Sequence, residues 1–273
     1  MIAFRLNFLI LLALAMCLPA LGGVLPAPKH GGVYVMAHRG AHVGIPENTL
    51  AAYQKAIDLG ADYVEIDLRT TKDGELVSVH NADVDHYTQG AVKGKVRDHT
   101  LAELKAMDIG SRVGAEWANE RIPTFDEILT LCKGKIGIYL DFKDAGVTQT
   151  LGVIRKHQME KDILWYASFK ALEQVQAECA ECIIMPDPGP AKNLPKLFER
   201  FPGVPVVASV WKFYSQEFLK QCQDAGAAVI VDESDPSCWA DALTWGTDGI
   251  QTDDPEGLIR FLDAQGATQP AAK

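Results

Sequence analysis

The sequence has no excess of positive charge, and it is poor in cysteine. Its 273 residues carry a formal net charge of −10 at pH 7, which excludes the broad basic surface of a nucleic-acid-binding protein. Six cysteines in a chain of this length do not form a small disulfide scaffold. Cys179 and Cys182 have no second pair with which to build a zinc site, so they either close a tight loop or act in redox chemistry.

Long apolar runs are also missing, except for one near the N-terminus. Phe8 to Leu18 is too short to span a bilayer comfortably but suits the core of a signal peptide, so we expect no stable membrane span. We expect residues 1–22 to be a signal peptide, cleaved after Ala20-Leu21-Gly22, and the protein to be exported to the periplasm or secreted. The alternatives are a buried or anchoring helix, or a lipoprotein acylated at Cys17, against which the preceding Met16 argues.

Beyond this segment, short apolar runs rich in β-branched residues alternate with amphipathic, helix-like runs. Several of the short runs are apolar throughout, as expected for parallel strands buried on both faces. Eight strands in about 250 residues favour a closed TIM (β/α)8 barrel over an open sheet. The expected strands lie near residues 33–38, 62–67, 136–142, 162–167, 182–185, 205–209, 228–231 and 248–251.

We expect one barrel domain over residues 31–265, with an inserted segment at about 81–122. The insertion breaks the alternation because it holds no clear buried strand, and we interpret it as a lid or rim at the barrel mouth. Residues 266–273 are expected to be a disordered tail. Helix caps are predicted at Asn48 for a helix over 49–59, Thr100 for 101–107, Thr124 for 125–132, and Asp254 for the last helix.

Acidic side chains stand at the ends of two expected strands. Glu65 and Asp67 are two residues apart in the second strand, so they share one face, which points to the centre of a barrel mouth. Two carboxylates this close need a positive group between them, and hard oxygen ligands favour Mg²⁺ or Ca²⁺. Asp141, in the third long strand, can complete the metal site, and Lys143 can face a substrate anion.

Two histidines are expected at the same mouth. His38 ends the first strand and is followed by Arg39, and His80 follows a short strand-like run. One histidine can take a proton from an attacking oxygen while the other gives a proton to the leaving oxygen. Arg39 and a metal would offset the charge that develops on phosphate. Together these residues indicate phosphodiester cleavage, although each alone could be structural.

Several short motifs resemble those of the glycerophosphodiester phosphodiesterase family. They are His38-Arg39-Gly40, Pro46-Glu47-Asn48-Thr49, Glu65-Ile66-Asp67, Lys72-Asp73-Gly74, His80, Pro123-Thr124-Phe125-Asp126-Glu127 and Gly249 to Pro255. The resemblance runs from about residue 33 to residue 258. It implies a TIM-type barrel with an insertion after the second strand, and hydrolysis of glycerophosphodiesters to glycerol 3-phosphate and an alcohol. It also implies attack of the glycerol 2-hydroxyl on phosphorus through a cyclic phosphate.

The resemblance further implies roles for individual residues. The implied roles are His38 and His80 as the catalytic acid–base pair, Glu65 and Asp67 as metal ligands, Arg39 as a phosphate contact, and Glu47 in or directly behind the metal site. Which histidine is the base stays open, as does the choice between Mg²⁺ and Ca²⁺. The expected substrate is a small phosphodiester, with no nucleic-acid partner.

The chain departs from the family at two positions. The family usually has Glu-x-Lys where this chain has Asp141-Phe142-Lys143, and its seventh strand often ends in a Trp-Thr motif where this chain has Asp232-Glu233. The leaving-group side is therefore open, and Trp211, Phe213 and Tyr214 either line it for an alcohol or acyl chain or simply pack. The alternatives are a phosphodiesterase acting on lysophospholipids or another phosphodiester, and a non-catalytic binding protein. We interpret His42 as an ordinary loop histidine.

Overall fold

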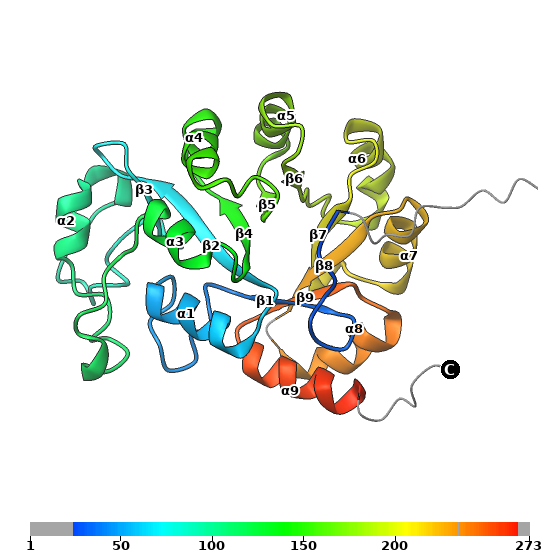
Figure 1. Cartoon of the computed structure of the whole chain (residues 1–273), viewed down its shortest axis with the longest axis horizontal. Coiled ribbons are helices and arrows are strands. Elements are labelled where there is room, and N and C mark those ends of the chain that lie inside the picture. The colour runs from blue at the N-terminus through cyan, green and yellow to red at the C-terminus, as the bar shows by residue number, and fades with distance from the viewer. Residues whose placement is uncertain (1–23, 234, 267–273) are drawn as a thin grey trace, which may run out of the picture.

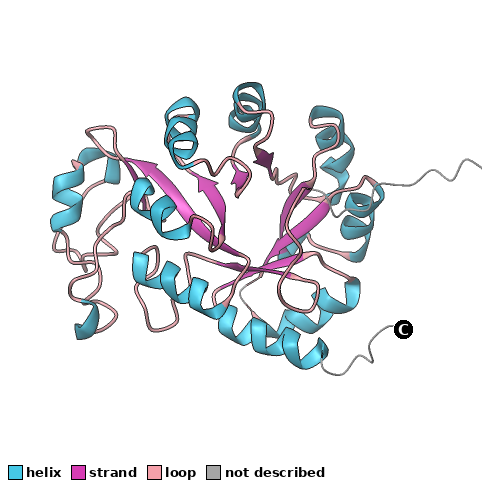
Figure 2. Cartoon of the chain, viewed as in Figure 1, coloured by secondary structure: helices cyan, strands magenta, loops and turns pink. Residues whose placement is uncertain are grey.

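The predicted strands are present and form one sheet that curls into a nearly closed barrel. The computed structural model describes residues 24–233 and 235–266. The parallel strands follow the order β6-β5-β4-β2-β1-β9-β8-β7, with helices on the outside (Figures 1 and 2). A backbone hydrogen bond of 3.0 Å from Ala208 N to Pro186 O links the two edges. The TIM-barrel prediction is confirmed.

The elements alternate along the chain much as the sequence predicts. The strands are β1 Tyr34–Ala37, β2 Tyr63–Thr70, β3 Leu76–Ser78, β4 Gly137–Phe142, β5 Ile163–Tyr166, β6 Ile183–Ile184, β7 Val206–Val210, β8 Ala228–Asp232 and β9 Gly249–Thr252. The helices are α1 Leu50–Leu59, α2 Leu101–Ala106, α3 Phe125–Cys132, α4 Val147–His157, α5 Phe169–Glu178, α6 Leu194–Arg200, α7 Gln216–Asp224, α8 Trp239–Trp245 and α9 Pro255–Gly266.

β3 lies outside the barrel order because it pairs antiparallel with β2 as a hairpin. The register joins Leu68 to Ser78 and Thr70 to Leu76. The hairpin turns the chain back toward the C-terminal end of the barrel, where it delivers His80. The short run before His80 is therefore a strand, as predicted, although it is not one of the eight barrel strands.

The capping boxes are confirmed, but one cap prediction is wrong. Thr100 and Thr124 each cap a helix together with the glutamate three residues later. The cap of α1 is Thr49, whose hydroxyl accepts from Ala52 N at 3.2 Å, and not Asn48. Asn48 lies one residue earlier with φ of +54°, a conformation that asparagine tolerates, and its side chain is used elsewhere.

Apolar side chains form separate layers inside and outside the barrel wall. The smaller cluster fills the barrel interior with residues such as Met36, Tyr139 and Ile230. The larger cluster lies between the strands and the surrounding helices. Since strand residues alternate between these layers, the polar residues at the C-terminal strand ends point into the mouth.

The segment 81–122 has a small apolar core of its own. Val84, Tyr87, Leu104 and Ile122 are buried there together with residues of β3. The segment extends beside β3 at the left of Figure 1, and Trp117 Nε1 donates a 2.9 Å hydrogen bond to Gly44 O in the loop before α1. It therefore forms a rim beside the barrel.

The two predicted terminal segments lie largely outside the described residues. The signal peptide prediction for residues 1–22 falls wholly there, and the tail prediction falls there except for Gly266, which ends α9 and is helical. In the described range, no helix has the length and apolar character needed to cross a membrane. Cys179 and Cys182 form a disulfide at the turn between α5 and β6, which answers the question of a tight loop.

Candidate active site

The site begins at the turn that follows β1. Arg39 has φ of +53° and Gly40 φ of +84°, so the chain reverses sharply after His38. A Cβ atom on Gly40 would lie 2.7 Å from Ala52 Cβ in α1, so only glycine fits. The turn aims the Arg39 backbone N–H at Glu65 Oε2, at 2.8 Å. The His-Arg-Gly order is thus dictated by the backbone as well as by chemistry.

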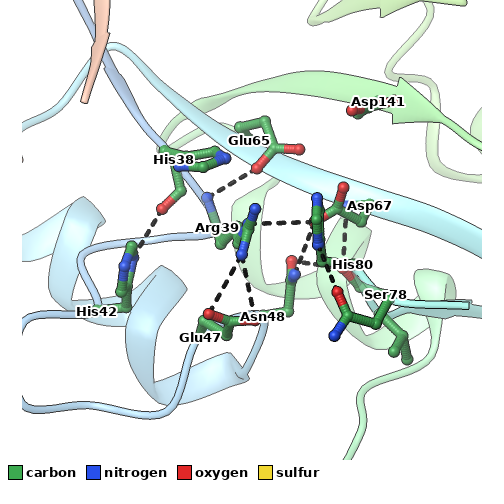
Figure 3. Close-up of polar contacts among 12 residues, drawn as sticks. His38, Arg39, His42, Glu47, Asn48, Glu65, Asp67, Ser78, His80 and Asp141 are labelled. Atoms are coloured by element: carbon green, nitrogen blue, oxygen red, sulfur yellow. Dashed lines mark hydrogen bonds and ion pairs between the residues drawn. The ribbon is translucent and has the colours of Figure 1, made fainter. Parts of the chain in front are cut away.

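Three carboxylates meet at the barrel mouth, as the sequence predicts. Glu65, Asp67 and Asp141 each offer an oxygen atom, and these atoms lie within 4.8 Å of one another (Figure 3). Asp67 and Asp141 are partners across the β2–β4 pairing, which confirms the predicted register. Burial and the neighbouring carboxylates raise the pKa of Glu65 well above its ordinary value, and burial also raises the pKa of Asp141.

The Lys143 ammonium is turned toward these acids. Its Nζ forms ion pairs with Asp141 and with Asp67 Oδ1, the latter at 3.1 Å. It was expected to face a substrate anion; in the unliganded structure it partly neutralises the carboxylates instead. Asp67 Oδ1 is buried and accepts no well-formed hydrogen bond. The cluster therefore has spare acceptor capacity for a cation.

A buried hydrogen-bond network holds Asp67 in place. Asn48 Nδ2 donates to Asp67 Oδ2 at 2.8 Å, while Asn48 Oδ1 accepts from the hydroxyls of Tyr53 and Ser78 at 2.8 and 2.9 Å. These residues come from the turn before α1, from α1 itself and from β3. The network explains the left-handed conformation of Asn48, and it is a role that the sequence did not reveal.

Arg39 lies between the acids and Glu47. Its Nη1 is 3.4 Å from both carboxylate oxygens of Glu47, and its Nε is 3.8 Å from Asp67 Oδ2. Arg39 lines the cleft at the barrel mouth, whereas Glu47 does not. Glu47 therefore lies behind the site, where it orients the guanidinium.

Each histidine of the predicted pair has its Nδ1 atom engaged. His38 Nδ1 lies 2.6 Å from Asp253 Oδ1, and His80 Nδ1 lies 2.9 Å from Asn81 Oδ1. Because a carboxylate and an amide oxygen only accept, Nδ1 carries the hydrogen in both rings. Nε2 of each ring is then the atom that exchanges protons with a ligand.

Asp253 is a site residue that sequence reasoning missed. It follows β9, so the same strand-end rule that found His38 could have found it. It also lies 3.6 Å from His42 Nε2, while His42 Nδ1 lies 2.9 Å from His38 O. His42 is thus next to the site rather than an ordinary loop residue, although it does not line the cleft.

The cleft has a volume of about 190 Å³ and opens at the C-terminal end of the barrel. Its lining residues are His38, Arg39, His80, Tyr139, Asp141, Tyr166, Asp187, Ala208, Ser209, Val210, Asp232 and Gln251. Trp211, Phe213 and Tyr214 are not among them, and Trp211 and Tyr214 pack against the outer core. The packing alternative therefore holds for these two aromatics.

Comparison with known proteins agrees with this geometry. Residues 38–168 match the model of the "Glycerophosphoryl diester phosphodiesterase family". This chain is a member of that family. The match covers the histidines, Arg39, the three acids and Lys143, so the membership rests on the segment that builds the site.

Relatives and solved structures of the phosphodiesterase family extend the comparison. The chain is 48% identical over 101 residues to a glycerophosphodiester phosphodiesterase of Caldanaerobacter subterraneus, a match covering 37% of this chain and 41% of that protein. It is 34% identical over 119 residues to one of Bacillus subtilis, covering 41% and 40%. The chain thus spans less than half the length of these two relatives.

A solved structure covers more of the chain. The Oleispira antarctica phosphodiesterase in complex with the product sn-glycerol-3-phosphate has a TM-score of 0.77 and 25% identity, and the match covers 84% of this chain and 96% of that one. The family's barrel is therefore shared over nearly the whole described region.

Proposed function

We propose that the protein hydrolyses glycerophosphodiesters to glycerol 3-phosphate and an alcohol, with a bound divalent cation and two histidines. The observation that carries the proposal is the convergence of His38, Arg39 and His80 with three carboxylates at one barrel mouth. Family membership supports the reaction class. The product held by the Oleispira antarctica protein fits the same substrate.

Glu65, Asp67 and Asp141 would hold the cation, and the donor set fits Mg²⁺ or Ca²⁺. All three offer carboxylate oxygens, which hard cations prefer, and they lie close enough to share one ion. The raised pKa of Glu65 reflects an anionic cluster that is short of positive charge. When bound, the cation would supply Lewis-acid stabilisation of charge on the phosphate oxygens.

The two histidines would move the protons. One Nε2 takes the proton of the glycerol 2-hydroxyl as its oxygen forms a bond to phosphorus, and the other Nε2 protonates the leaving alcohol as its P–O bond breaks. Water then opens the cyclic phosphate, with the two roles reversed. Asp253 would stabilise positive charge on His38, and Asn81 would keep the tautomer of His80. Arg39 would bind a non-bridging oxygen.

The structure favours deacylated substrates over lysophospholipids. An acyl chain needs an apolar surface beside the cleft, yet most large apolar side chains of the segment 81–122 are buried in its own core. In the described part of that segment, Val113 is the one large apolar residue that counts as exposed. The cleft itself is small and largely polar.

The test is turnover of sn-glycero-3-phosphocholine, its 2-deoxy analogue and a lysophosphatidylcholine, each with and without chelator. We expect rapid chelator-sensitive hydrolysis of the first substrate, and poor hydrolysis of the 2-deoxy analogue because it lacks the attacking hydroxyl. Preference for the lysolipid would favour the alternative substrate class. Binding without turnover of any diester would favour the non-catalytic alternative.

We also propose that the protein is exported. The apolar run at residues 8–18 and the Cys179–Cys182 disulfide support an oxidising compartment outside the cytoplasm. Fractionation of cells that express the full chain, with N-terminal sequencing of the product, tests this. Cytoplasmic recovery of an uncleaved chain would contradict it.

A further inference from the structure

The cleft has two halves of opposite charge. The basic half consists of His38, Arg39 and His80. The acidic half consists of Asp187, which follows β6, Asp232 at the end of β8, and Gln251 in β9. The proposed chemistry uses the basic half and the metal-binding acids, but it leaves the acidic half without a role.

The two carboxylates of the acidic half have no cation to neutralise them. Across the described residues, neither Asp187 nor Asp232 forms an ion pair with a lysine, arginine or histidine. Asp187 Oδ1 accepts from Gly189 N at 2.7 Å, and its Oδ2 lies 3.4 Å from the hydroxyl of Tyr166. Burial raises the pKa of Asp187, and the Asp232 carboxylate adds to the rise. Two acids in one confined cleft favour a positively charged ligand.

Gln251 is a second, independent sign of a ligand. It is only 4% exposed, and its Oε1 atom is buried without a hydrogen-bond partner. Its backbone is paired with Asp232 in β8 and Met36 in β1, and its side chain lines the cleft. Buried acceptors in native proteins are nearly always paired, so Oε1 requires a donor that arrives with the ligand.

The ligand of this half must belong to the substrate phosphodiester. Its phosphate lies at the basic half, so one of its two substituents extends to the acidic half. The glycerol substituent is neutral and would leave both carboxylates uncompensated. A leaving alcohol with a protonated amine supplies both a positive charge and N–H donors, whereas a quaternary ammonium supplies the charge alone.

We propose that Asp187, Asp232 and Gln251 form the leaving-group subsite and select alcohols that carry a protonated primary amine. This inference rests on the proposed function and names its preferred substrate class. The amine would donate to Gln251 Oε1 and to the two carboxylates, and the ring of Tyr166 would form part of the wall. A zwitterionic diester thus matches the order of charges along the cleft.

The experiment compares three diesters of glycerol 3-phosphate that differ only in the leaving alcohol: ethanolamine, choline and the neutral ethylene glycol. We expect the wild-type kcat/KM for the ethanolamine diester to exceed that for the ethylene glycol diester by about tenfold or more, the range of hydrogen bonds to charged groups. The choline diester should fall between them.

Asp187→Asn, Asp232→Asn and Gln251→Met should each move the ethanolamine-to-ethylene glycol ratio toward one, mainly through the KM of the ethanolamine diester. Asp224→Asn is the matched control, because it makes the same charge change at the exposed C-terminal end of α7, where it pairs with Lys220. It should leave the ratio unchanged. Far-ultraviolet circular dichroism and melting curves check that every variant is folded.

The possible failures can be told apart. Hydrolysis of all three diesters at equal kcat/KM overturns the subsite and leaves the proposed function standing. Loss by the same factor on all three diesters in the variants assigns these residues to glycerol or to the barrel, and also overturns it. A preference for the choline diester overturns the selection of a primary amine. Hydrolysis of none of them overturns the proposed function, and the subsite falls with it.

Discussion

The basic and acidic halves of the cleft differ in how firmly their polar groups are held. Around the basic half, Asn48 is bonded to Asp67, Tyr53 and Ser78, and the Arg39 backbone is bonded to Glu65. In the acidic half, Asp187 has one short hydrogen bond and Gln251 Oε1 has none. Groups that perform chemistry need fixed positions, whereas groups that recognise a ligand can complete their bonding when it arrives.

Metal removal is the strongest way to break this comparison, since it should abolish turnover. Dialysis against EDTA should remove activity and added Mg²⁺ or Ca²⁺ should restore it, because the three carboxylates repel one another without a cation. Independently of activity, the ion at 100 times its Kd should stabilise the fold by about 2.7 kcal/mol. Differential scanning calorimetry measures this stabilisation.

A matched pair of variants locates the ion. Glu65→Gln should lose the stabilisation by added metal, whereas Glu199→Gln, an exposed acid on α6, should keep it. Full activity after dialysis against EDTA would exclude the metal from the mechanism.

Removing either histidine should have the next largest effect. His38→Ala and His80→Ala should each lower kcat by roughly 10²–10⁴-fold, the usual contribution of a positioned acid or base. His157→Ala is the control, since this histidine pairs with Asp126 on the outer face of α4, and its kcat should stay at the wild-type value. A folded double variant of His38 and His80 with near wild-type kcat would remove both residues from the chemistry.

Asp253→Asn tests the residue that orients His38. Loss of the charged partner at 2.6 Å should lower kcat by about 10- to 100-fold, the range for a hydrogen bond to a charged group, with little change in KM. Asp263→Asn, at the exposed His30 pair, is the comparison variant. An effect of Asp253→Asn on KM alone would instead assign Asp253 to substrate binding.

The third carboxylate can be tested by length and by charge. Asp141→Asn should weaken metal affinity, because one anionic ligand is lost. Asp141→Glu should be tolerated with a kcat within about tenfold of wild type, since the family usually carries the longer acid and the change keeps the charge. Isothermal titration with Mg²⁺ and Ca²⁺ measures both effects. Equal metal affinity in wild type and Asp141→Asn would remove Asp141 from the ligand set.

Two serines sharpen the comparison at the smallest scale. Ser78→Ala should lower the free energy of unfolding by about 1–3 kcal/mol, because it leaves buried partners in the Asn48 network unsatisfied. Ser209→Ala in the cleft should cost less than about 1 kcal/mol, since its hydroxyl makes one 3.3 Å bond to Val210 O. Urea unfolding of both variants decides, and a larger loss for Ser209→Ala would contradict the difference between the halves.

Much of this architecture could be predicted from the sequence because strand ends have a fixed address. Buried apolar runs marked all eight strands, and the period of two put Glu65 and Asp67 on one face. The position of Asp141 opposite Asp67 followed from the same rule. A parallel barrel brings every such end to one mouth, so distant residues converge without further information.

The rest depends on side-chain contacts that no local pattern encodes. Asn48 looked like a helix cap, but Thr49 caps α1 because the turn leaves Asn48 in a left-handed conformation facing Asp67. Asp253 and Gln251 were invisible as site residues because each acquires its meaning from a neighbour on another strand or loop. The outward course of the segment 81–122 likewise follows from its own apolar core rather than from the barrel.

The barrel seam has a consequence for how the molecule opens. β6 has only two residues, and the link between its edge and β7 includes the single backbone bond from Ala208 N to Pro186 O, next to Asp187. Cooperative opening in proteins starts where few backbone bonds must break together. Amide hydrogen exchange should therefore be fastest, among the barrel strands, along this seam, and an amine seated on Asp187 would slow it by bracing the two edges against each other.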